Sequence, residues 1–102
     1  MKSTYTFIAH NVGKYIEEHS DNIDRARVEE IKNSWEEDAD CAYVGTLHIR
    51  GEKEKIFAAD YGDFVRIAME HDKEEDHSVD PDMDPAEKIG NAIITHINMI
   101  TG

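Results

Sequence analysis

Hydrophobic residues near the start of the chain recur at helical spacing. Ile8, Val12 and Ile16 are four residues apart, which predicts a helix over 6–19. Gly13 weakens this helix, and residues 3–8 are rich in β-formers. A short opening strand therefore stays open as the alternative for this end of the chain.

The end of the chain carries the clearest helix pattern. Asp84, Pro85 and Glu87 form a start signal, in which Asp84 is the N-cap and Pro85 the first helical residue. The following stripe predicts a final helix from about Pro85 to Thr101 and consists of Ile89, Ile93, Ile97 and Ile100. Ile94 broadens the apolar face, so a homodimer through this helix is an open alternative.

Two further helices and one hairpin are predicted between these ends. A second helix runs from about 22 to 38, with Val28, Ile31 and Trp35 along its buried stripe. A third opens at Asp60 and runs to about 71, since Asp60 and Asp63 resemble a capping pair. The β-formers of 41–50 and 55–58 flank a turn, which predicts an antiparallel β-hairpin near 42–58. The expected fold is a compact single α+β domain over 1–102, with about four helices and one hairpin.

Charge is concentrated in one stretch of the chain. Residues 70–87 hold nine carboxylates and one base, Lys73, in a chain whose formal net charge is −12. Such a field repels phosphate and attracts cations or basic protein surfaces. With 11 Lys and Arg residues dispersed among 23 Asp and Glu residues, direct binding of nucleic acid is not expected.

No catalytic motif accompanies this charge. The glycines are dispersed and form no phosphate-binding loop, and the lone Cys41 is typical of a small buried hydrophobe. A single cysteine also indicates a reducing compartment, and no stretch is apolar enough to span a membrane. We expect a non-enzymatic, cytoplasmic protein, in the host cytoplasm if the source is viral, with no membrane partner.

Metal binding is also not expected from the spacing of candidate ligands. If 71–77 is helical, His71 and Glu75 share a face while His77 points elsewhere. The acidic residues from Asp80 onward begin like a calcium loop, but Pro85 stands where that loop needs glycine. The sequence therefore predicts no tightly bound zinc or calcium and no cofactor.

Clustered carboxylates without catalytic groups favour an inhibitor of a basic protein or nucleoprotein complex. The candidate partner-binding residues are Glu29, Glu30, Glu36, Glu37, Asp38, Asp40, Glu70, Asp72, Glu74, Glu75, Asp76, Asp80 and Asp82. In size and charge the chain is similar to phage-encoded anti-defence inhibitors of the anti-CRISPR or anti-restriction type, which implies nucleic-acid mimicry. The alternative is an acidic adaptor or immunity-type protein that binds a basic partner without mimicry.

Overall fold

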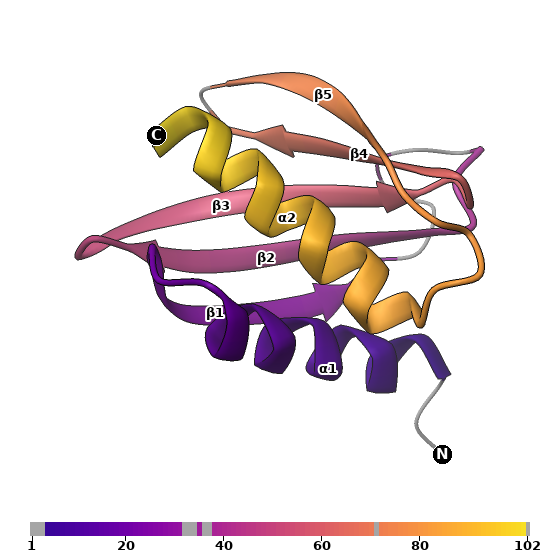
Figure 1. The fold of residues 1–102 in the computed structure, drawn as a ribbon, viewed down its shortest axis with the longest axis horizontal. Helices are drawn as coiled ribbons and strands as arrows, with labels where there is room; N and C mark the ends of the chain where they lie inside the picture. The colour runs from indigo at the N-terminus through magenta and orange to yellow at the C-terminus, as the bar shows by residue number, and fades with distance from the viewer. Residues whose placement is uncertain (1–3, 32–34, 36–37, 71, 102) are drawn as a thin grey trace.

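A computed structural model describes residues 4–31, 35, 38–70 and 72–101 of the chain. Within these ranges the chain forms two helices and five strands (Figure 1). In chain order they are α1 (Thr4–His19), β1 (Ile23–Glu30), β2 (Cys41–Ile49), β3 (Glu52–Asp60), β4 (Phe64–Met69), β5 (Asp72–Ser78) and α2 (Pro85–Thr101). The strands form one antiparallel sheet in the order β1-β2-β3-β4-β5, so β1 and β5 are its edges.

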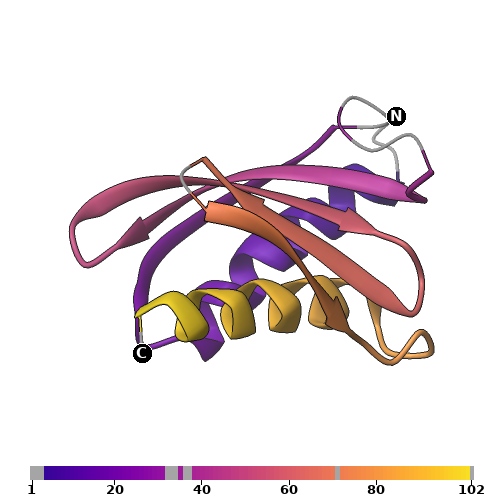
Figure 2. The same cartoon turned by 90° about the horizontal axis from the view of Figure 1, so that it is seen from above.

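Both helices lie on the same side of the sheet (Figure 2). The hydrophobic core fills the space between these two layers. Its most deeply buried aliphatic residues are Val12, Ile16, Leu47, Ile56, Val65, Ile67, Ile89, Ile93 and Ile97. Neither helix covers the opposite face of the sheet. None of the described helices combines the length and apolar character needed to cross a bilayer.

The expectation of about four helices with one hairpin is wrong, and the predicted second helix shows why. Residues 23–30 form β1, in which Ala26 and Val28 are buried while Arg25 and Arg27 are exposed. That two-residue alternation is the pattern of a half-buried strand. Pairing with β2 therefore overrides the helical spacing from Val28 onward.

The predicted third helix is also a strand, β4. Its residues alternate between half-buried and buried, with Val65, Ile67 and Met69 directed into the core. Asp60 does not cap a helix; its carboxylate accepts a hydrogen bond from the Gly62 N–H at 2.9 Å. This local bond shapes the tight turn between β3 and β4, which explains why the aspartates resembled a capping pair.

Strand β5 had no counterpart in the sequence analysis, since it contains no apolar residue. It is defined by backbone pairing with β4, and all its residues except His77 are exposed. Charged side chains on an edge strand discourage pairing with another sheet. This composition explains why hydrophobic periodicity does not reveal the strand.

Other elements agree with the sequence. The final helix spans Pro85–Thr101 as predicted, and α1 is helical from Thr4, so the alternative opening strand is wrong. The hairpin near 42–58 is present as β2 and β3, although it is one of four antiparallel pairings. Ile94 packs against the core, while Met99 and Ile100 remain exposed on α2.

Candidate functional site

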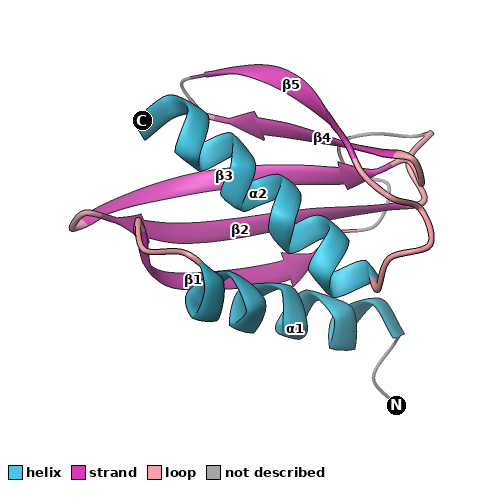
Figure 3. Ribbon diagram, in the orientation of Figure 1, coloured by secondary structure: helices cyan, strands magenta, loops and turns pink. Residues whose placement is uncertain are grey.

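Three connections lie at one end of the sheet (Figure 3), and their described residues include several exposed aspartates. The Asp40 N–H donates to the Asp60 carbonyl at 2.8 Å, and the Val79 N–H donates to the Asp63 carbonyl at 3.0 Å. These bonds join the β1–β2, β3–β4 and β5–α2 connections. We call the exposed carboxylates there the acidic end: Asp38, Asp40, Asp63, Asp80, Asp82 and Asp84.

A buried ion pair supports the acidic end from inside. Lys88 reaches from α2 to the β3–β4 turn, where its Nζ lies 3.0 Å from Asp60 Oδ1 and 3.3 Å from the Gly62 carbonyl oxygen. The two side chains are only 7% and 13% exposed. Because Lys88 is already paired and buried, its charge screens the surface carboxylates poorly.

The structure divides the carboxylates predicted from the sequence among several places. Asp38, Asp40, Asp80 and Asp82 meet at the acidic end, to which the β3–β4 turn adds Asp63. The remaining described ones lie on β1 or along the β4–β5 turn and β5: Glu29, Glu30, Glu70, Asp72, Glu74, Glu75 and Asp76. Glu36 and Glu37 lie outside the described residues. Sequence reasoning missed Asp63 because it placed that residue inside a helix.

One part of the uncovered face of the sheet, over β1, β2 and β3, has the opposite charge. Strand register aligns Arg25 with His48 and Lys53 in one row across β1, β2 and β3. The next row contains Arg27, Thr46 and Lys55. We call the five basic side chains of these rows the basic patch: Arg25, Arg27, His48, Lys53 and Lys55. Glu29 offsets part of this charge through its ion pair with Arg27 at 3.2 Å.

Aromatic side chains border the basic patch. Trp35 contacts the Phe57 ring with 5.7 Å between centroids, and Lys55 Nζ lies 5.8 Å from the Phe57 centroid. At the opposite end of the sheet, away from the basic patch, Tyr61 of the β3–β4 turn stacks on Phe64 at 4.6 Å and lies beside Arg66. Aromatic rings beside basic residues are typical of surfaces that bind single-stranded nucleic acid.

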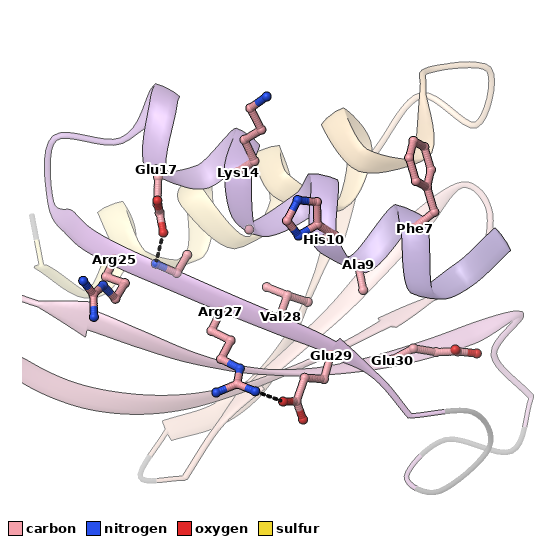
Figure 4. A pocket seen from close by; sticks show the side chains of 12 residues that line it. Phe7, Ala9, His10, Lys14, Glu17, Arg25, Arg27, Val28, Glu29 and Glu30 are labelled. Carbon is pink, nitrogen blue, oxygen red and sulfur yellow. Dashed lines mark hydrogen bonds and ion pairs between the residues drawn. The ribbon is translucent and has the colours of Figure 1, made fainter. Parts of the chain in front are cut away.

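A groove of about 760 Å³ runs between α1 and β1 (Figure 4). Gly13 allows the close approach of the helix, because a Cβ there would lie 2.9 Å from the Ala26 carbonyl oxygen. Glu17 accepts a hydrogen bond from the Ala26 N–H at 2.9 Å. Figure 4 shows Arg27 pointing away from α1, paired with Glu29 at 3.2 Å. The close approach at Gly13 and the hydrogen bond to Glu17 fix α1 on β1, the strand that carries Arg25 and Arg27 of the basic patch.

Cys41 is unsuited to nucleophilic catalysis in this fold. The residue is 1% exposed. Burial is the main cause that raises the pKa of the Cys41 thiol. The reactive thiolate is therefore scarce at neutral pH, as for a structural cysteine.

Comparisons with protein-family models, curated protein sequences and solved structures found no match for this chain. The acidic end and the basic patch are therefore the surfaces that bear on its function.

Proposed function

We propose that this protein is a non-enzymatic inhibitor that binds a basic, nucleic-acid-binding partner through its acidic end. The observation that supports this function is the convergence of carboxylates from three separate connections onto one end of the sheet. Duplex DNA carries one phosphate charge per roughly 1.7 Å of axis, so a mimic needs several carboxylates close together. Three connections that meet supply that density better than one continuous strand.

The acidic end also suits rapid capture of a basic surface. Complementary charge accelerates association, and exposed charges are screened beyond about 8 Å at physiological ionic strength. We therefore expect fast association that slows as salt increases. The proposed compartment is the cytoplasm, in keeping with the lone cysteine.

The test begins with a partner recovered by pull-down from the native host and continues as a competition titration. Nucleic acid and this protein are added to the same partner, and binding of each is measured separately. Mimicry predicts that each lowers the apparent affinity of the other. If both bind together without mutual loss of affinity, mimicry is wrong.

Charge reversal locates the contact. Asp63→Lys with Asp82→Lys changes the acidic end, and the expected result is at least about a tenfold loss of affinity, because like charges across an interface cost several kcal/mol. Glu52→Lys with Glu70→Lys is the matched control, since both residues are exposed at the other end of the sheet, Glu52 at the start of β3 and Glu70 in the β4–β5 turn. Equal losses in the two double variants would indicate that net charge, not the acidic end, drives binding.

The basic patch favours a second candidate, an adaptor on a nucleoprotein complex. In this arrangement the acidic end faces basic protein, while Arg25, Lys53 and their neighbours face phosphate. The same titration separates the candidates, because nucleic acid would then strengthen binding. Lys53→Glu with Lys55→Glu would remove that gain, whereas a mimic would bind as before.

A further inference from the structure

Three side chains with metal-binding chemistry converge where β5 meets α2. Glu75 and His77 come from β5, and His96 comes from α2. His77 Nε2 lies 3.1 Å from His96 Nδ1, and Glu75 Oε2 lies 3.9 Å from the same nitrogen. One ligand atom from each residue lies within 4.8 Å of the other two. A strand places Glu75 and His77 on the same face because they are two residues apart.

No metal site was predicted here from the sequence, because residues 71–77 were considered as a helix. In a helix Glu75 and His77 face different directions, and His71 was the partner considered for Glu75. His71 lies outside the described residues. The structure instead adds His96, which is 19 residues from His77 in sequence and which no local spacing could connect to β5.

His96 is costly to the fold in its unliganded form. It is 1% exposed and occupies a core position between Ile93 and Ile97, where an aliphatic residue would pack without polar groups. Its Nε2 has no hydrogen-bond partner among the described residues, and its Nδ1 faces His77 and Glu75. A buried polar atom without a partner costs about 1–3 kcal/mol. Metal binding at Nδ1 would not give Nε2 a partner, but a ligand that binds only the folded state would stabilise the fold against this cost.

The distances suit a small divalent ion. Tetrahedral zinc with bonds of about 2.0–2.1 Å places neighbouring ligand atoms roughly 3.3–3.4 Å apart. Two of the three separations, 3.1 and 3.9 Å, bracket that value, and the third is within 4.8 Å. Two imidazoles and one carboxylate are also an established set of zinc ligands with an open fourth position.

We propose that Glu75, His77 and His96 form a binding site for a first-row divalent transition metal ion, with zinc as the best fit. Calcium and magnesium are poor fits because they require six or more oxygen ligands, including water. Glu75 is about half exposed, which leaves the fourth position facing solvent.

Two electrostatic features support the site. Burial is the main cause that lowers the pKa of His96, so its neutral, ligating form prevails at neutral pH. Asp72 and Glu75 supply negative charge near its ring. Ligation through Nδ1 requires the ring proton to be on Nε2, which lacks an acceptor among the described residues. Missing second-shell partners typically weaken metal sites by about 10–100-fold, so we expect reversible binding.

The test uses the full chain, treated with chelator and then titrated with zinc chloride by isothermal titration calorimetry. Cobalt chloride in a parallel titration reports tetrahedral nitrogen and oxygen ligation through its visible absorption. Salt of about 0.15 M suppresses weak ion condensation on exposed carboxylates. Magnesium chloride is the negative control.

Glu75→Gln and His77→Gln test the ligands without changing the buried His96. Glu74→Gln is the matched control, because it removes the same charge from the preceding residue of the strand, which is not one of the three clustered residues. We expect one zinc per chain, a loss of more than about tenfold in both ligand variants, and little change in the control. Circular dichroism establishes that each variant is folded; if His77→Gln unfolds, Glu75→Gln decides alone.

Three outcomes would overturn the site. The first is wild-type protein that shows no saturable zinc binding. The second is an equal loss in Glu75→Gln and Glu74→Gln, which would identify diffuse condensation on the acidic surface. The third is magnesium binding as strongly as zinc. Partner binding through the acidic end does not depend on this result, so the two proposals succeed or fail separately.

Discussion

The acidic end and the basic patch are assembled in opposite ways. The acidic end draws on connections, and half of its residues (Asp80, Asp82 and Asp84) come from one acidic run of sequence. The basic patch draws on three strands, and sheet register aligns its residues. One surface therefore depends on how loops meet, and the other depends on pairing at the edge strand β1.

This difference explains how much of each surface can be recognised from the sequence alone. A run of carboxylates is visible as composition, whereas bases spread over 25–55 look dispersed until strands are paired. Because each side chain on a strand alternates between faces, a shift of one residue in β1 would turn Arg25 and Arg27 toward the helices. The basic patch is thus the more fragile of the two surfaces.

The largest expected effect comes from breaking the ion pair beneath the acidic end. Lys88→Met leaves the Asp60 carboxylate buried without its partner at 3.0 Å. Removing one member of a buried pair typically costs about 3–5 kcal/mol. Urea denaturation followed by circular dichroism measures this change in the free energy of unfolding.

Two controls separate the lost ion pair from the changed side chain. Lys14→Met makes the same substitution at an exposed site on α1 and should change stability by less than about 0.5 kcal/mol. Adding Asp60→Asn to Lys88→Met should recover part of the loss, because no buried charge is then left unpaired. No recovery in this double variant would argue against the pair as the cause.

A smaller loss is expected from disturbing the strand under the basic patch. In Gly13→Ala the new Cβ would lie 2.9 Å from the Ala26 carbonyl oxygen, so α1 must move away from β1. Overpacking costs about 1–3 kcal/mol, which exceeds the gain of up to about 1 kcal/mol from replacing glycine in a helix. Lys14→Ala, at the next position, should leave stability unchanged or raise it. A Gly13→Ala protein more stable than wild type would contradict the close approach.

Sequence reasoning identified the elements whose patterns are complete in themselves. The final helix carries its own cap signal and isoleucine stripe, and the β2–β3 hairpin carries its own turn. Strand β4 was missed because Asp60 and Asp63 resembled a helix cap, although Val65, Ile67 and Met69 alternate. Strand β5 carries no hydrophobic signal at all, because backbone pairing with β4 defines it.

The candidate sites follow the same rule. Asp80 and Asp82 could be found as part of a charged run, but Asp63 joins them only when the β3–β4 turn forms. In the sequence, His96 is simply one residue of an amphipathic helix. In the fold, β5 brings His77 beside it. Long-range pairing, which local spacing does not encode, determined each of these associations.

The smallest expected change in stability comes from an ion pair on the uncovered face of the sheet. This pair joins β4 to β5, the strand that belongs to the acidic run 70–87. Arg66 donates to Asp76 through Nε at 2.8 Å and through Nη2 at 3.2 Å. The pair is partly exposed, with side-chain exposures of 27% and 47%. Asp76→Asn should therefore cost less than about 1 kcal/mol at neutral pH, as is usual for surface ion pairs.

The pH dependence of that loss identifies its source. The hydrogen bond from Arg66 is the main cause that lowers the pKa of Asp76, so the folded state favours the charged carboxylate. This stabilisation is present above the ordinary aspartate pKa of about 3.9 and disappears as pH falls through the lowered value. Urea denaturation between pH 7 and pH 2 should thus show the gap between wild type and Asp76→Asn narrowing below about pH 4. If the difference in unfolding free energy between wild type and Asp76→Asn persists in acid, Asp76 contributes through packing or backbone geometry. The ionic link between the acidic run and the sheet face would then be wrong.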